Sequence, residues 1–262
     1  MKNKLRKLSA ENIFDFLHRG MIITFALLVL MFVFLQTLHS TSNLPDNSIV
    51  YFYFFIGAIV LIYLFFWFPR VTSKVLRLIL FEDINLSKYH NYFDYAYKRS
   101  NRRNKSANLQ ELYLTEAQVL FLRGDFRTSE QRILSIDQYK MSFRFRKNHK
   151  KMISFLRFMN SVHRSETKKI TEYLAELERV DYQKEVANAI YDILTGQSND
   201  YFETIRPKSH LTQIIVTYYR ALNAILNNEN EKAQALFVSI ADENSELFYV
   251  QEAKKFLGMT RN

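Results

Sequence analysis

Two long apolar runs near the start of the chain dominate its pattern of hydrophobic and polar positions. They cover Gly20–Leu38 and Ile49–Phe68, and neither contains a charged residue. A helix needs about 20 apolar residues to cross the roughly 30 Å hydrocarbon core of a bilayer, and each run has about that length. The link between them, His39–Ser48, carries three residues that favour turns, Pro45, Asp46 and Asn47. The pattern predicts a transmembrane helical hairpin over residues 20–68, preceded by a basic segment over residues 1–19.

The first apolar run also raises the alternative of a cleaved signal peptide. The apolar region of a signal peptide has about 7–15 residues, and a small-residue cleavage site follows it. Here the run is longer, and only Ser40 and Ser42 offer small side chains behind it. We therefore expect the first run to remain in the protein as a membrane span.

Residues 69–107 are predicted to form a helical and basic juxtamembrane segment. Pro69 directly follows the second run, and we expect it to kink or end that helix because proline lacks the backbone N–H. Val71–Phe81 then forms a separate helix, which either lies on the inner membrane surface or packs into the next domain. Farther on, apolar residues at helical spacing predict one face of a further helix, made of Tyr89, Tyr92, Phe93, Ala96 and Tyr97.

Residues 108–262 alternate between apolar helical faces and short polar turns. The predicted turns are Arg123–Phe126, Asn160–Ser165, Thr195–Asp200 and Asn227–Asn230. Measured from Gly124 through Asn160 and Gly196 to Asn228, the spacing is 36, 36 and 32 residues. Periods of this size are typical of arrays of two-helix repeats. A last helix, Ser245–Leu257, is expected to cover the open end of the array.

Small residues recur around these predicted turns. The first unit has Ala117, then Gly124-Asp125-Phe126, then Ser129 and Ile133. The last unit keeps Ala221, Ala233 and Phe237, whereas the middle units keep fewer such positions, Ser165, Ala189 and Gly196. Over roughly 107–257 the chain thus resembles the tetratricopeptide repeat family in a degenerate form. The resemblance implies an all-α protein-binding scaffold with a concave groove, and it implies no chemistry.

Basic residues lie on both sides of the predicted hairpin. The chain has a formal net charge of +10, of which residues 1–19 contribute +3 and residues 70–110 contribute +6, whereas the link has only Asp46. Cytoplasmic flanks of membrane spans are enriched in Lys and Arg. We therefore expect a multi-pass plasma-membrane protein with both termini in the cytoplasm. The predicted membrane-interface anchors are Tyr51, Tyr63, Trp67, Arg70, Lys74 and Arg77.

A second basic stretch, Lys140–Arg157, contains no acidic residue. Its candidate anion- or partner-binding patch is Lys140, Arg144, Arg146, Lys147, Lys150 and Lys151. One interpretation is a face that recognises acidic peptide, anionic lipid or phosphate. The other is a solvated helix face that its tether turns toward the inner leaflet. The sequence leaves both open.

The sequence shows no motif for catalysis. The chain has no Cys, and its six His are scattered. It contains no P-loop, Rossmann glycine pattern, H-E-x-x-H or G-x-S-x-G. A lone histidine in a predicted turn, such as His163, is more often structural or on the surface than catalytic. We expect no enzymatic activity, no cofactor and no metal.

These patterns predict a membrane-anchored, bacterial scaffold or adaptor whose cytoplasmic repeat domain recruits protein partners and faces anionic lipid. An alternative is an accessory or regulatory subunit of a transport, secretion or envelope-synthesis complex that acts through the hairpin, where Gly57 and Ala58 would pack on a partner. Nucleic-acid binding through residues 98–105 and 140–157 is a third possibility. We do not expect it, because membrane topology already accounts for the position of the charge.

Overall fold

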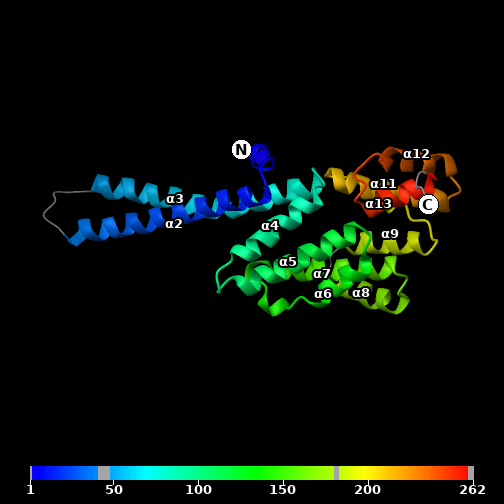
Figure 1. Cartoon of the computed structure of the whole chain (residues 1–262), viewed down its shortest axis with the longest axis horizontal. Helices are drawn as coiled ribbons and strands as arrows, with labels where there is room; N and C mark the ends of the chain where they lie inside the picture. Colours follow the sequence, from blue (N-terminus) through cyan, green and yellow to red (C-terminus); the bar gives the residue numbers. More distant parts are fainter. Residues whose placement is uncertain (1, 41–47, 180–182, 259–262) are drawn as a thin grey trace. The chain divides into compact units, whose positions relative to one another are not determined.

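The protein is helical throughout the part of the chain that the structure describes. This computed structural model describes residues 2–40, 48–179 and 183–258, without the side chains of 2–3, 35, 38–40, 48–53 and 143–145. Every regular element in these ranges is a helix, which confirms the all-α prediction for them. The chain divides into two compact units, Met1–Ile79 (unit 1) and Leu80–Asn262 (unit 2) (Figure 1). The described helices are α1 (Lys2–Leu5), α2 (Ala10–Ser40), α3 (Ser48–Phe81), α4 (Leu86–Arg99), α5 (Lys105–Leu122), α6 (Phe126–Leu134), the 3₁₀ helix η1 (Gln138–Lys140), α7 (Phe143–His163), α8 (Thr167–Arg179), α9 (Lys184–Leu194), α10 (Tyr201–Thr204), α11 (His210–Leu226), α12 (Asn230–Ala241) and α13 (Phe248–Phe256).

Unit 1 is built on an antiparallel pair of long helices, α2 and α3 (Figure 1). The rings of Phe34 and Phe54 lie with their centroids 5.3 Å apart, and those of Phe25 and Phe65 lie 6.4 Å apart. The later residue on α2, Phe34, contacts the earlier residue on α3, Phe54, which is the order expected for an antiparallel pair. Both helices are long and apolar enough to cross a membrane. The predicted turn between them, with Pro45, Asp46 and Asn47, lies outside the described residues.

Two glycines show how closely these helices approach. A Cβ added to Gly20 would lie 2.5 Å from the ring of Phe68, and one added to Gly57 would lie 3.5 Å from Sδ of Met31. From Gly20 to Met31 the chain advances by 11 residues, and from Phe68 to Gly57 it goes back by 11. The two helices therefore keep one register along the hairpin.

Unit 1 exposes its apolar residues over one part of the hairpin and buries them over another. Large apolar side chains are exposed at residues 22–34 and 55–66, which we call the apolar belt; Leu30, for example, is 65 % exposed. By contrast, Ile13, Leu17, Val71 and Val75 are buried. The register of the hairpin places Leu17 opposite Val71 and Ile13 opposite Val75, so the two helices still face each other beyond the belt.

Helix α3 does not end at Pro69, where the sequence predicts a kink or an end. It runs on to Phe81, and the separate helix predicted over Val71–Phe81 is instead its last turns. Two side chains that follow the proline donate to carbonyls one turn before them: the Thr72 hydroxyl donates to the carbonyl of Phe68 at 3.0 Å, and the Arg70 guanidinium donates to that of Phe66 at 3.3 Å. Side-chain bonds to the backbone near a proline are one way in which a helix tolerates it.

Four helices of unit 2 end in the same kind of turn. Gly124, Ser165, Gly196 and Asn228 all have positive φ, between 55° and 90°. In each case the N–H of that residue bonds the carbonyl three positions back, and the next N–H bonds the carbonyl five positions before itself. This pair of bonds is the Schellman arrangement, which satisfies the last carbonyls of a helix. The turns join the helix pairs α5–α6, α7–α8, α9–α10 and α11–α12.

The second turn lies later than the sequence spacing suggests. Its positive-φ residue is Ser165, whereas Asn160 is buried inside α7, where its amide donates to the hydroxyl of Ser129 at 3.0 Å. The four turns are therefore 41, 31 and 32 residues apart rather than 36, 36 and 32. The third pair is also incomplete, since α10 has only 4 residues.

The first helix pair of unit 2, α5–α6, packs on the last helix, α13, and through it on α11. A Cβ added to Gly124 would lie 2.9 Å from the ring of Phe248, at the start of α13. Phe126 packs edge-to-face on Phe248, with centroids 5.0 Å apart, and Phe248 also contacts Tyr218 of α11. These contacts go beyond the nearest-neighbour packing of a linear array.

Candidate functional site

The predicted membrane-interface anchors whose side chains are described lie on α3, Tyr63 within the apolar belt and the others after it. The side chain of Tyr51 lies outside the described residues. Tyr63 is 63 % exposed, and Trp67 is half-buried against Phe68, with ring centroids 5.3 Å apart. The remaining three predicted anchors are exposed at helical spacing, on one face of α3: Arg70, Lys74 and Arg77. Unit 1 thus combines an uncharged apolar surface with a basic stripe beside it.

The candidate patch at residues 140–151 is only partly an exposed cationic surface. Lys147 and Lys150 are exposed, and the side chain of Arg144 lies outside the described residues. Lys140 is exposed and pairs with Asp137 at 3.1 Å. Lys151 is half-buried.

Arg146 has a structural task within this patch. Its guanidinium donates to the carbonyls of Tyr139 and Met141, at 2.9 and 3.2 Å. These bonds fix the connection between η1 and α7. The guanidinium of Arg146 therefore stabilises the local backbone of the patch.

Two other side chains of the same stretch, His149 and Arg157, join the helices of unit 2. His149 lies 3.2 Å from a carboxylate oxygen of Glu111 on α5. Arg157 bonds the buried carboxylate of Glu130 at 3.2 Å and the hydroxyl of Tyr173 at 2.6 Å. A buried carboxylate needs such a partner, because burial of an unpaired charge is strongly unfavourable. Arg157 therefore stabilises a buried carboxylate, and both side chains contribute contacts between helices.

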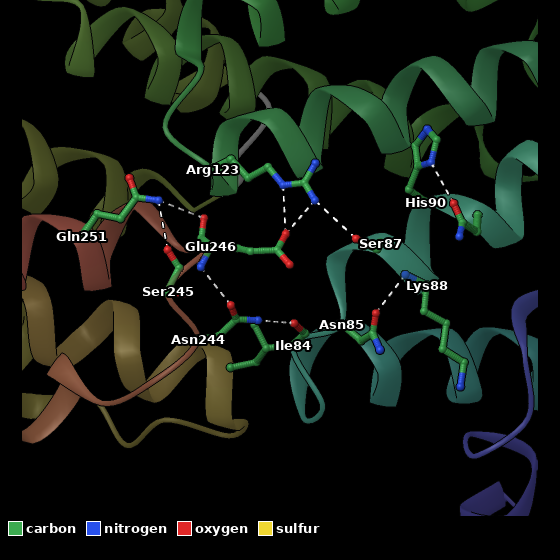
Figure 2. A network of polar contacts seen from close by, with 11 residues as sticks. Ile84, Asn85, Ser87, Lys88, His90, Arg123, Asn244, Ser245, Glu246 and Gln251 are labelled. Atoms are coloured by element: carbon green, nitrogen blue, oxygen red, sulfur yellow. Dashed lines mark hydrogen bonds and ion pairs between the residues drawn. The ribbon is translucent and has the colours of Figure 1, made fainter.

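A network that the sequence analysis missed holds the segment after α3 to the C-terminal helices (Figure 2). The amide of Asn244 donates to the carbonyl of Ile84 at 2.7 Å. Arg123 bonds Glu246 at 2.6 Å and contacts the hydroxyl of Ser87 at 3.4 Å. Ile84 is buried with φ of 48°, which is unusual for a β-branched residue, so these contacts hold a strained backbone.

His210 extends this network at the start of α11. Its Nε2 lies 3.0 Å from Glu243, and its Nδ1 lies 3.3 Å from the carbonyl of Glu82. The hydrogen bond to Glu243 raises the pKa of His210. No sequence motif marks this network, because its members are up to 160 residues apart.

His163 is structural, as expected for a lone histidine, and it lies among aromatic rings. Its ring stacks on Phe126 with centroids 4.4 Å apart, and it meets Phe248 edge-to-face at 5.1 Å. Nε2 lies 3.3 Å from the hydroxyl of Tyr219. Desolvation lowers the pKa of His163 to about 4, so the ring is neutral at physiological pH.

Within residues 2–40, 48–179 and 183–258, no group of three or more His, Cys, Asp or Glu is placed to hold a metal ion. Comparisons with family models, with curated proteins and with solved structures find no match to this chain. Two surface features of the described residues bear on function: the exposed apolar belt of unit 1 and the exposed basic residues of unit 2.

Proposed function

We propose that the protein is a membrane-anchored scaffold, in which the hairpin of α2 and α3 spans the plasma membrane and unit 2 binds protein partners on the cytoplasmic side. The observation that carries the proposal is the apolar belt. Water-exposed apolar surface of this length is unfavourable in a soluble protein, whereas a bilayer removes it from water. In an 18-residue apolar stretch of α2 only 11 % of the residues are buried, and in one of α3 only 6 %. The core helices of a soluble protein are mostly buried.

The charge distribution supports cytoplasmic termini. Exposed Arg70, Lys74 and Arg77 follow the belt on α3, and Arg19 precedes it on α2. Their cations would face the headgroups and the cytoplasm, in line with the positive-inside rule. Topology can be read from single cysteines, since the chain has none of its own. A membrane-impermeant maleimide should label Ser42→Cys on intact cells, and should label Ser245→Cys only after lysis.

Four helix pairs with the same turn support a partner-binding repeat domain similar to tetratricopeptide repeats. Such pairs stack their apolar faces and leave one face free for partners. The contact of Phe248 with the Gly124 turn adds a closure that a linear array lacks. We infer a compact variant in which partners bind an outer surface of the pairs.

Co-purification tests the scaffold. Partners cross-linked to the full chain should be lost when residues 108–262 are removed, with membrane insertion of the hairpin as the control. Equal recovery from both chains would disprove the scaffold function.

The alternative function through the hairpin has less support. Gly57, which would bring a partner helix close, already faces Met31 within the hairpin. Replacing residues 20–68 by an unrelated hairpin discriminates the two proposals. A scaffold should keep its function after the exchange, whereas a subunit that acts through the hairpin should lose it.

A further inference from the structure

Two basic stretches that are separate in the sequence both lie near the N-terminal end of α5 in unit 2. Residues 98–105 connect α4 to α5 and contain five Lys or Arg. Residues 137–151 contain η1 and the start of α7, with six Lys or Arg and one acid, Asp137. We call these two stretches together the basic end.

The first turns of α5 hold the basic end together. Lys105 is the first residue of α5 and the last of the first stretch. The side chain of Gln110 accepts a hydrogen bond from the backbone N–H of Asp137 at 2.7 Å, and Glu111 lies 3.2 Å from His149. With a rise of 1.5 Å per residue, Gln110 lies about 8 Å along the helix from Lys105. Both stretches therefore gather around the same two turns.

Much of the charge at the basic end is not neutralised. Lys98 pairs with Asp94 at 2.6 Å and Lys140 with Asp137 at 3.1 Å. Four other cations are exposed, and within the described part of the chain no carboxylate pairs with them: Arg102, Arg103, Lys147 and Lys150. A cluster of this kind is attracted to anionic lipid headgroups, and each Lys or Arg adds to the attraction.

The second stretch of the basic end also carries an exposed aromatic side chain. Tyr139 is 88 % exposed, and its backbone is fixed on both sides. The carboxylate of Asp137 accepts from its N–H at 3.0 Å, and Arg146 donates to its carbonyl at 2.9 Å. Tyrosine has an apolar body with a polar tip and prefers the headgroup level of a bilayer. The basic end thus presents an exposed aromatic ring on a backbone that two hydrogen bonds fix.

We propose that the basic end docks on the phosphate headgroups of anionic lipids in the same bilayer that the hairpin spans, with the Tyr139 ring entering the headgroup layer. The proposal rests on the proposed function, because the hairpin supplies the bilayer. Tethering places the cations at a high effective concentration of lipid, so modest attraction per charge is sufficient. The exposed ring favours lipid over an acidic polypeptide, since it needs an apolar layer to enter. Docking would fix which surfaces of unit 2 face the cytoplasm and its partners.

The test uses the full chain in nanodiscs with an environment-sensitive dye on Tyr139→Cys. We expect a blue shift of the dye in discs with 30 % anionic lipid, no shift in zwitterionic discs, and reversal in 1 M salt, where the Debye length is about 3 Å. The double change Lys147→Glu and Lys150→Glu should abolish the shift, because each unit of positive charge lost weakens binding to anionic lipid about fivefold. Lys168→Glu with Lys208→Glu, at exposed lysines elsewhere in unit 2, is the control with the same charge change and should leave it intact.

The outcomes separate the docking from the membrane anchor. Trp67 is the single tryptophan, so its quenching by brominated lipid reports the hairpin independently. Quenching without a dye response in anionic discs overturns the docking alone, and no quenching overturns the anchor as well. An equal dye shift in zwitterionic discs would contradict an electrostatic contact. A shift produced only by added poly-glutamate would identify an acidic polypeptide as the occupant and overturn the lipid proposal.

Discussion

The two units treat the same kind of side chain in opposite ways. Phe32, in the apolar belt of unit 1, is 61 % exposed, whereas Phe237, on α12 of unit 2, is 1 % exposed. Both belong to regular helices, so helix propensity does not distinguish them. Unit 2 folds by removing apolar surface from water within its own chain, whereas the belt needs apolar surroundings that the described chain does not supply. The comparison can be tested one side chain at a time.

The largest effect on the free energy of unfolding is expected when a buried side chain in the core of unit 2 is truncated. Phe237→Ala should lower the free energy of unfolding by about 3–5 kcal/mol, because it removes a buried ring and leaves a cavity. Its neighbour Val238 is 51 % exposed, so Val238→Ala should change it by less than about 0.5 kcal/mol. Urea unfolding of the full chain in nanodiscs, followed by circular dichroism, measures both. If Phe32→Ala in the belt or Val238→Ala cost as much as Phe237→Ala, the contrast between the units would fail.

A pair of glycines sharpens the comparison within unit 2. Gly124 and Gly196 both have φ near 90°, so alanine at either position costs about 1–2 kcal/mol for the left-handed backbone. Only Gly124→Ala also forces a Cβ against Phe248, whereas nothing lies within 4 Å of a Cβ at Gly196. This overpacking adds about 1–3 kcal/mol to the loss of stability in Gly124→Ala. The difference between the two variants in the same unfolding experiment therefore isolates the contact between the α5–α6 turn and α13, and equal losses would contradict that contact.

The pH dependence of unit 2 tests the environment of His163. Its pKa of about 4 lies below the ordinary value of 6.5, so the folded protein favours the neutral ring. Stability from this group is complete above pH 6.5 and is lost as the pH falls toward 4, by about 2 kcal/mol between pH 7.5 and pH 5. His163→Phe should flatten this part of the profile, measured by urea unfolding across the range. An unaltered slope in His163→Phe would show that other groups cause it.

The sequence carries strong signals for what is local and weak ones for what is distant. The apolar runs and the four turn ranges could be placed, because hydrophobic period and Gly or Asn at turns act over a few residues. Within the range Asn160–Ser165 the turn lies at Ser165 and not at Asn160, whose amide makes a buried hydrogen bond to Ser129. Pro69 does not end α3: the helix continues to Phe81, and the side chains of Arg70 and Thr72 bond carbonyls one turn before them.

The candidate surface of unit 2 was predicted in part for the same reason. The stretch from Lys140 onward is visible as a charge pattern, but the sequence does not separate exposed Lys147 from Arg157, which bonds a buried carboxylate. Nor does it show that residues 98–105 lie at the same end of α5. Both facts depend on contacts between helices that are distant in the chain.

The smallest effect on the free energy of unfolding is expected for a solvent-exposed ion pair on the surface of unit 2. Arg123 and Glu246 are bonded at 2.6 Å, and their side chains are 41 % and 44 % exposed. Such a pair contributes about 0.2–1 kcal/mol, since solvent screens it and ordering two long side chains opposes it. A double-mutant cycle with Arg123→Ala and Glu246→Ala should give a coupling in that range, falling at 1 M salt. Coupling above about 2 kcal/mol would mean that the pair also holds the strained backbone at Ile84, through Ser87 and Asn244, and that the surface of unit 2 is as cooperative as its core.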